Sequence, residues 1–288
     1  TVLAGGTLHP LDLLQHQLFP SLQADRISTF SCGHVVPKEN LASFVLSSAP
    51  NGALFNFSFQ SRSTEQIDQL GLALEAFCRV VPGGVVCFFP SYALAADVHH
   101  RWSQTRQLSR LQKRVFCESS STSSTASSFS KTPSGEPGIL AAYRACVERE
   151  GGALLLAVVG GKLSEGINFS DALGRCVVVV GVPFPNPQDP VLRERLSRAT
   201  TTPPLGGPGR LRTYSQLYET MAMNAVNQSV GRAIRHARDY GTIVLVDSRY
   251  SLGRLTELLP AWIASYGVST GGFADVLSGL TSFFAHTR

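Results

Sequence analysis

The 288-residue chain is 43% hydrophobic and 16% charged, and the usual charged share is roughly 25%. This composition excludes an intrinsically disordered protein. The length predicts one large α/β domain. No stretch approaches the ~20 apolar residues of a membrane span, because the longest run, Ala153–Val159, has the length of a strand. The net charge is +5, and ten Arg stand against four acidic residues between Pro190 and Arg254. Because Arg suits bidentate phosphate contacts, a polyanionic partner is indicated, with a solvated Arg-rich face as the alternative.

Short apolar runs of strand length recur along the chain, and helical patterns separate several of them. The runs are continuous rather than alternating, which predicts strands that are buried on both faces. Apolar residues at 3-and-4 spacing predict helices over Ile67–Cys78, Leu94–Trp102 and Ile139–Arg149. We therefore expect a mostly parallel β-sheet covered by helices on both faces, with its chemistry at the carboxyl ends of the strands. The predicted strands are Val2–Ala4, Phe44–Leu46, Val85–Phe89, Leu154–Val159, Cys176–Val182 and Ile243–Val246.

Two segments and the cysteines bear on domain organisation. Ser119–Ser134 holds twelve Ser or Thr in sixteen residues and cannot build a core, so we predict a flexible insertion over residues 118–137. Thr200–Pro208 predicts a loop. None of the six Cys lies within eight residues of another, which argues against a zinc or iron–sulfur site in this chain and indicates buried free thiols.

A glycine-rich segment, Val158–Asp171, follows one of the predicted buried strands. Its Gly-Gly-Lys at 160–162 suggests a phosphate-binding loop, but that loop needs Gly-x-x-x-x-Gly-Lys-Ser/Thr. Leu163 follows the Lys here, and no Gly precedes it at the required spacing. The chain therefore has no Walker A motif of its own, although the carboxylates of Glu165 and Asp171 favour a site over an ordinary turn.

The segment Tyr214–His236 carries the strongest chemical pattern. Placed on one helix, its polar residues share a face opposite an apolar stripe, and two Arg on that face could neutralise the charge that develops during phosphoryl transfer. Ordinary surface salt bridges are the alternative. A mid-helix Gly231 costs about 1 kcal/mol relative to Ala, which suggests close approach by a backbone or a ligand. The polar face is Asn224, Gln228, Arg232 and Arg235, and the apolar stripe is Ala222, Val226, Val230, Ala233 and Ala237.

Four of these segments together resemble a known family. Gln-Ser-Val-Gly-Arg-Ala-Ile-Arg-His at 228–236 resembles motif VI of superfamily 2 helicases, and Gly-Lys-Leu-Ser-Glu-Gly-Ile-Asn-Phe-Ser-Asp at 161–171 resembles motif V. Ala-Gly-Gly-Thr-Leu at 4–8 is similar to motif III, and Cys-Phe-Phe-Pro-Ser-Tyr at 87–92 is similar to motif IV. The residues of these motifs and their order along the chain resemble those of XPD-like DNA helicases. Within that group they are most similar to the ChlR-type branch, which is linked to sister-chromatid cohesion.

This resemblance implies a second RecA-like motor domain, in the P-loop NTPase superfamily, over residues 1–288. The first motor domain, the iron–sulfur domain and the arch domain would lie upstream, so we expect the chain to be the C-terminal piece of a longer protein. The full protein would couple ATP hydrolysis to movement along single-stranded DNA and to unwinding, whereas this piece alone would not hydrolyse ATP. A catalytically inactive remnant that only binds nucleic acid or protein is the alternative.

The resemblance also assigns roles residue by residue. Arg232 and Arg235 would reach the ATP phosphates, and Gln228 would position them or the attacking water. The remaining residues at the nucleotide edge would be Glu165, Gly166, Asp171 and Gly231. Contact with DNA would come from Ser91, Tyr92 and Lys162, and coupling to the nucleotide site from Thr7. Asp247 and Arg249 resemble an Asp-x-Arg of the family's last strand, for which a structural salt bridge is the expected role.

Cofactors, partners and location follow from the same resemblance. ATP and Mg²⁺ would be shared with the upstream motor domain, a 4Fe-4S cluster would lie in the full-length protein but not in this chain, and no metal is assigned here. Single-stranded and forked DNA, the upstream motor domain, and replication or cohesion factors would be the partners. We expect a nuclear protein without membrane contact.

Overall fold

The computed structural model of the chain describes residues 1–5, 11, 15, 18–19, 22–30, 33, 35–119, 138–163, 169–201 and 213–287. Thr7, predicted for coupling, lies outside these ranges. So do Glu165 and Gly166, two of the residues predicted for the nucleotide edge. So does most of the insertion predicted at 118–137, apart from Glu118 and Ser119. Within the described ranges, no helix combines the length and the apolar character that crossing a bilayer requires.

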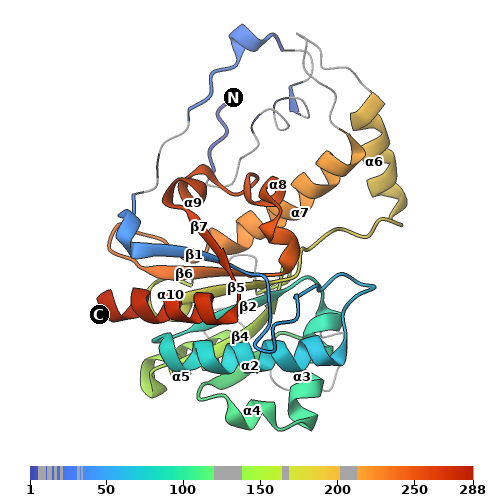
Figure 1. Ribbon diagram of the computed structural model, residues 1–288. Helices are drawn as coiled ribbons and strands as arrows, with labels where there is room; N and C mark the ends of the chain where they lie inside the picture. Colours follow the sequence, from blue (N-terminus) through green and yellow to red (C-terminus); the bar gives the residue numbers. More distant parts are fainter. Residues whose placement is uncertain are drawn as a thin grey trace.

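One seven-stranded sheet of parallel strands forms the centre of the molecule, in the order β3-β4-β2-β5-β6-β1-β7 (Figure 1). The central strands are continuous runs of apolar, mostly β-branched or aromatic residues, and every residue of β2, β4, β5 and β6 is buried. The predicted mostly parallel sheet is thus confirmed. The strands are β1 (Leu41–Leu46), β2 (Val85–Phe89), β3 (Arg114–Cys117), β4 (Ala153–Val158), β5 (Cys176–Val180), β6 (Gly241–Val246) and β7 (Val268–Gly271).

Helices cover both faces of this sheet, and successive residues of each strand alternate between two hydrophobic clusters. Val86 and Phe88 pack in the cluster with α5 (Gly138–Glu150), α7 (Tyr214–Val230), α8 (Gly253–Thr256) and α9 (Ala261–Tyr266). Val85, Cys87 and Phe89 pack in the cluster with α2 (Thr64–Val80), α3 (Tyr92–Gln104) and α10 (Phe273–His286). Figure 1 shows α2, α3 and α10 on one side and α7, α8 and α9 on the other.

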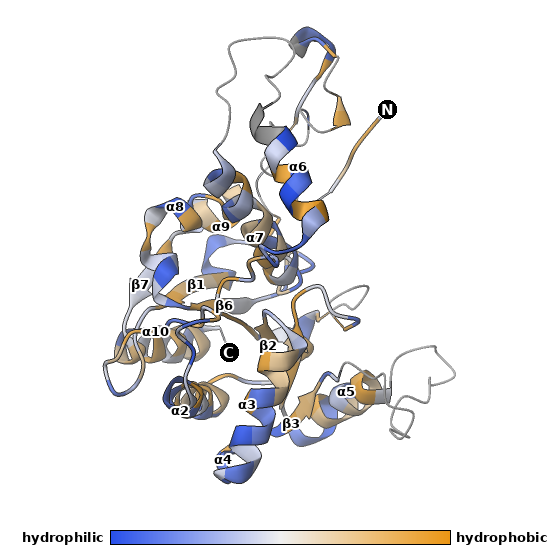
Figure 2. Cartoon of the chain, turned by 90° about the vertical axis from the view of Figure 1, so that its right-hand side faces the viewer, coloured by the Kyte–Doolittle hydropathy of each residue, from blue (hydrophilic) through white to orange (hydrophobic). Residues whose placement is uncertain are grey.

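The remaining elements are short or peripheral. They are the 3-10 helices η1 (Ala24–Arg26), η2 (Lys38–Asn40), η3 (Asp171–Gly174) and η4 (Ser248–Ser251), and the helices α4 (Gln107–Arg110) and α6 (Pro190–Thr201). Side-chain caps fix where the long helices begin: Ser63, Ser91 and Thr213 each accept a hydrogen bond from the backbone N–H three residues later. Figure 2 shows the apolar interior of β2 against the largely hydrophilic outer faces of α3 and α4.

Two element predictions are wrong. Val2–Ala4 is exposed and forms no strand, because a short apolar run becomes a strand only where a neighbour can pair with it. Helix α7 ends at Val230 rather than continuing to His236. The two edge strands, β3 and β7, were not predicted, because their residues are mostly half-buried or exposed and lack a continuous apolar run.

Candidate functional site

The predicted site residues lie at two opposite edges of the sheet. Ser91, Tyr92 and Lys162 follow β2 and β4, so they lie at the carboxyl ends of the strands, as expected. Asp171 and the residues 231–239 precede β5 and β6, so they lie at the amino ends. The expectation that all the chemistry gathers at the carboxyl edge is therefore wrong for the arginine segment, which returns along α7 before it enters β6.

The end of α7 corrects the interpretation of Gly231. This residue is the C-cap of the helix, with φ −63° and ψ −2°, a conformation open to any amino acid, so no mid-helix glycine is present. The next residues form turns, with the N–H groups of Arg232 and Ala233 donating to Ser229 and Val230. Ala233 stays buried but Ala237 is exposed, so the predicted apolar stripe does not continue to Ala237 beyond the helix end.

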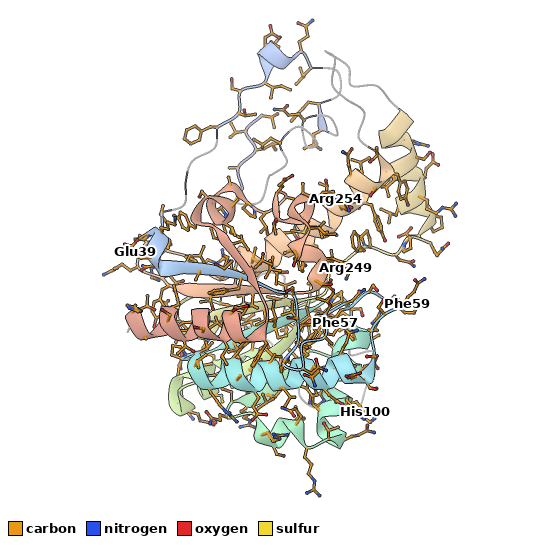
Figure 3. The ribbon with its side chains drawn as sticks, viewed as in Figure 1. Glu39, Phe57, Phe59, His100, Arg249 and Arg254 are labelled. Atoms are coloured by element: carbon orange, nitrogen blue, oxygen red, sulfur yellow. The ribbon has the colours of Figure 1, made fainter. Side chains whose placement is uncertain are left out.

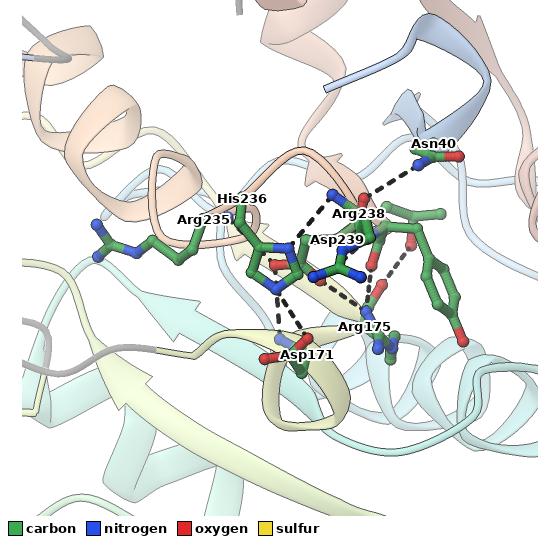
Figure 4. A network of polar contacts seen from close by, with 9 residues as sticks. Asn40, Asp171, Arg175, Arg235, His236, Arg238 and Asp239 are labelled. Carbon is green, nitrogen blue, oxygen red and sulfur yellow. Dashed lines mark hydrogen bonds and ion pairs between the residues drawn. The ribbon is translucent and has the colours of Figure 1, made fainter. Parts of the chain in front are cut away.

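Asp239 organises the loop that carries the two arginines. Its side chain is fully buried and accepts hydrogen bonds from the backbone N–H of Arg235 at 3.1 Å and of Tyr240 at 3.0 Å. The Arg175 guanidinium donates to its Oδ1 at 2.8 Å, and the N–H of Asp171 lies 3.5 Å from its Oδ2. Because β5 and β6 are neighbouring parallel strands, their preceding loops meet here (Figure 4).

The Arg235 side chain is exposed, and its guanidinium points away from this network (Figure 4). The backbone N–H of Arg235 is held by Asp239, while its guanidinium is directed outward. A side chain that acts on an external ligand requires this arrangement. Gln228 is exposed near the end of α7, and Arg232 is half-buried.

A contact between a histidine and an aspartate joins the two loops at the amino edge. The Nε2 of His236 lies 3.0 Å from Oδ1 of Asp171, and both side chains are about half exposed. Asp171 has a φ of +57°, in the left-handed region that non-glycine residues rarely adopt. Asp171, His236 and Asp239 are close enough to hold a metal ion, but Asp239 is already engaged by Arg175 and three backbone N–H groups.

At the carboxyl edge, a buried Glu118 organises the turn after β4. Its carboxylate accepts hydrogen bonds from Tyr92 Oη at 2.9 Å, from the N–H of Val158 at 2.9 Å and from the N–H of Leu163 at 3.0 Å. Tyr92 Oη in turn accepts from the N–H of Lys162 at 3.2 Å. Two of the predicted DNA-contacting residues, Tyr92 and Lys162, are therefore tied to one acid that sequence reasoning placed inside a flexible insertion.

The adjacent glycines of this turn are needed for different reasons. Gly160 has a φ of +68°, which favours glycine, and open space around its missing side chain. At Gly161 a Cβ atom would lie 2.7 Å from Glu118 Oε1 and 2.8 Å from Tyr92 Oη. The turn thus admits the Glu118 carboxylate only because position 161 has no side chain.

Asp247 and Arg249 form the salt bridge that was expected. Arg249 Nε and Nη2 donate to the two oxygens of the fully buried Asp247 at 2.8 and 2.9 Å. The same carboxylate accepts from the N–H of Phe57 at 2.9 Å, which anchors the loop after β1. Its role in the described structure is to join loops.

Five of the six cysteines lie in the part of the chain that the structure describes. Cys78, Cys87, Cys146 and Cys176 are buried and Cys117 is half-buried, and all five are free thiols. Burial raises the pKa of Cys78 and of Cys176 to about 12, and that of Cys117 to about 11. Burial thus disfavours the thiolate form of these three side chains, which is the form that binds metals.

Sequence reasoning missed Glu118, Arg175 and Asp239. Each was a single charged residue outside any recognised motif, and its role arises from loops that are distant along the chain. A signal was present in the case of Asp239, because a carboxylate directly before an apolar strand and close to several Arg is costly to bury unless it is paired.

Residues 74–266 match the family model described as the helicase C-terminal domain. The chain is 41% identical over 302 residues to "ATP-dependent DNA helicase DDX11" of Danio rerio, covering all of the chain and 32% of that protein. It is 43% identical over 280 residues to the Mus musculus protein of the same name, covering 91% of the chain and 29% of that protein. The chain thus spans about a third of the length of these relatives.

A solved structure of an XPD helicase superposes on 80% of the chain and 35% of its own length, with a TM-score of 0.53 at 19% sequence identity. At that identity the likeness concerns the fold alone. It agrees with the parallel sheet covered on both faces, and it identifies the fold as RecA-like.

Proposed function

The chain belongs to the helicase C-terminal domain family, and from this membership we propose that it is the second motor half of an ATP-dependent DNA helicase. The full protein would couple ATP hydrolysis to translocation on single-stranded DNA and to duplex unwinding. One observation carries the proposal: the Arg235 backbone is held by the buried Asp239, while its guanidinium is exposed and directed outward.

At the amino edge, Arg235 and Arg232 would neutralise charge on the transferring phosphoryl group, with Gln228 ordering them or the attacking water. Asp171, Gly231, Glu165 and Gly166 would border the nucleotide. The sequence has no Walker A motif, so the loop that cradles the phosphates and the carboxylates that hold Mg²⁺ would belong to an upstream motor domain. When bound, Mg²⁺ would supply charge neutralisation on the phosphates.

At the carboxyl edge, Lys162 and the hydroxyl groups of Ser91 and Tyr92 would contact the phosphates of a DNA strand, and Thr7 would couple the two sites. The relatives are named ATP-dependent DNA helicases, which supports DNA as the substrate. Forked DNA, replication or cohesion factors and a nuclear location complete the proposal. A 4Fe-4S cluster of the full protein would lie outside this chain, because the five described thiols each lie in a different helix or strand.

The decisive experiment replaces Arg235 in a full-length protein that supplies the upstream motor domain. Arg235→Ala should lower kcat for DNA-stimulated ATP hydrolysis by ~10³–10⁵, the range for an arginine finger. Arg235→Lys should recover little, because a point charge does not reproduce the planar fork. DNA binding without nucleotide should stay unchanged, because the residue lies at the opposite edge from Lys162. Arg198→Ala is the matched control, since Arg198 is exposed and pairs with Glu194 four residues earlier on the same helix.

Two outcomes would count against the proposal. If Arg235→Ala abolished DNA binding and left ATP turnover intact, the roles of the two edges would be reversed. If the full-length protein bound DNA without any ATP turnover, the catalytically inactive binding module would be the better description.

A further inference from the structure

Phe59 is an unusually exposed aromatic residue in the loop that follows β1. Its side chain is 85% exposed, whereas Phe55 and Phe57, at the two preceding alternate positions, are 0% and 3% exposed. The buried pair stacks with ring centroids 5.5 Å apart. Of the three Phe rings at alternate positions of this loop, two are therefore buried, and the ring of Phe59 is exposed to solvent (Figure 3).

The loop that carries Phe59 is fixed rather than loosely attached. The N–H of Phe57 donates to buried Asp247, and the N–H of Ser248 donates to the carbonyl of Phe55 at 2.8 Å. On the other side of Phe59, the N–H of Arg62 donates to the carbonyl of Ser58 at 3.1 Å. An exposed ring on a fixed loop can bind a planar ligand without a large cost in ordering.

One face of the Phe59 ring is already occupied by a cation. The guanidinium carbon of Arg62 lies 4.8 Å from the ring centroid. Arg62 has no carboxylate partner, and its buried Nε has no hydrogen-bond partner, among the residues that the structure describes. Within the described part of the chain, the pair thus offers a second, open aromatic face and a positive charge that no carboxylate neutralises. Proteins use these two features to hold single-stranded nucleic acid without reading its sequence.

The pair lies on the carboxyl edge of the sheet, where the DNA contacts of the proposed function lie. A Cβ atom on Gly181 would be 3.0 Å from Phe57 Cβ and 3.8 Å from Pro90 Cγ. The loop therefore packs beside Pro90, which follows β2. The next residue, Ser91, is the N-cap of α3.

From this placement we infer that Phe59, supported by Arg62, stacks on an unpaired nucleobase of the DNA strand. The inference rests on the proposed function, because it needs a strand along the carboxyl edge. It adds a contact to the base, whereas Lys162, Ser91 and Tyr92 are assigned to the phosphates.

The test measures binding of the 288-residue chain to a thymidine homopolymer of about 15 nucleotides. A second oligomer of the same length carries abasic sites instead of bases. Phe59→Ala should weaken binding to the thymidine oligomer by roughly 5- to 150-fold, the range of one base–aromatic stack. It should not alter binding to the abasic oligomer or the slope of log affinity against log salt, because the ring meets no phosphate.

Matched variants separate the contributions. Leu54→Ala removes another exposed apolar side chain, 66% exposed, from the same loop and should leave binding unchanged. Phe59→Trp should retain affinity, and its added indole emission should be quenched by thymidine but not by the abasic oligomer. Lys162→Ala should reduce the magnitude of the salt slope by about 0.7. Urea unfolding of each variant checks that the fold is retained.

The outcomes distinguish the inference from the proposed function. If Phe59→Ala binds like the unchanged chain while Lys162→Ala shifts the salt slope, the stacking inference is overturned and the proposed function stands. Equal weakening on both oligomers, or unquenched Phe59→Trp emission, also overturns stacking. If the unchanged chain binds neither oligomer, the DNA contact of the proposed function fails, and the inference fails with it.

Discussion

Three buried carboxylates, Glu118, Asp239 and Asp247, hold the loops of this domain by the same means. Each accepts hydrogen bonds from at least two backbone N–H groups, and each also pairs with a side chain, namely Tyr92, Arg175 and Arg249 respectively. An ionised group buried in this way is costly to leave without its partners. The positions of the candidate site residues therefore depend on acids that take no part in the proposed chemistry.

Replacing Asp239 tests this dependence. Asp239→Ala leaves the nearly buried Arg175 without its partner, so the free energy of unfolding should fall by about 3–5 kcal/mol, as for a broken buried ion pair. Urea unfolding monitored by circular dichroism measures the change. Glu194→Ala, which breaks the exposed pair with Arg198, should cost about 0.5 kcal/mol or less. Similar losses in the two variants would contradict a structural role for Asp239.

At the scale of elements, the turn after β4 offers a comparison between neighbouring glycines. Gly160→Ala must place a side chain at φ +68°, which should cost about 1–2 kcal/mol. Gly161→Ala should cost more, about 2–3 kcal/mol, because its Cβ would displace the Glu118 carboxylate from the hydrogen bonds that hold the turn. Tyr92→Phe combined with Gly161→Ala should recover part of the loss, since it removes the oxygen that the Cβ approaches at 2.8 Å.

Chemical denaturation of the two single variants and the double variant provides the measurement. If the effects of Tyr92→Phe and Gly161→Ala simply add, the two positions do not interact, and the close approach to Tyr92 Oη is not what requires glycine at position 161.

The central elements could be predicted from the sequence, because burial on both faces leaves a continuous apolar run that few other environments produce. The strands from Val85, Leu154, Cys176 and Ile243 follow this rule. The helices around Leu70, Val98 and Val147 could be predicted because one buried face leaves apolar residues at 3-and-4 spacing. The edge strands β3 and β7 could not be predicted, because one side of each faces solvent and their residues are mixed. The true end of α7 was also hidden, since Ala233 continues the apolar stripe beyond the last helical residue.

Motifs in the sequence could predict which residues belong to the candidate site, but they could not predict how those residues are arranged in space. Motif-like segments marked Arg235, Lys162 and Tyr92 directly. The division between two edges depends on which strand each segment precedes or follows in the sheet order, and that order is set by long-range pairing.

At the scale of the whole molecule, the buried thiols contribute to a loss of stability at alkaline pH. The ordinary pKa of these thiols is 9.0, and burial raises it to about 12 for Cys78 and Cys176 and to about 11 for Cys117. Below pH 9 both the folded and the unfolded chain keep these protons, so the full stability is present. As pH rises through this window the unfolded chain ionises first, and the stability is progressively lost.

The free energy of unfolding should therefore fall from about pH 9 upward, by ~1.4 kcal/mol per pH unit for each thiol. Urea midpoints measured between about pH 8 and pH 11 under reducing conditions check the decline. Cys176→Ala should show a shallower decline over the same range. A midpoint that stays constant across the range would mean that these thiols ionise as readily in the folded chain as in the unfolded one.

The placement of the two candidate edges has a consequence for signalling inside the domain. Strands of five or six residues separate the edges by roughly 17–20 Å, so no single ligand group reaches both. The polypeptide between Leu163, held by Glu118, and Asp171, held beside Asp239, connects them in eight steps along the chain. If occupancy of one edge changes affinity at the other, thermodynamic reciprocity requires both ligands to report the same coupling factor. A titration of nucleotide against DNA, performed in either order in the full protein, would then yield a single coupling factor for the two edges.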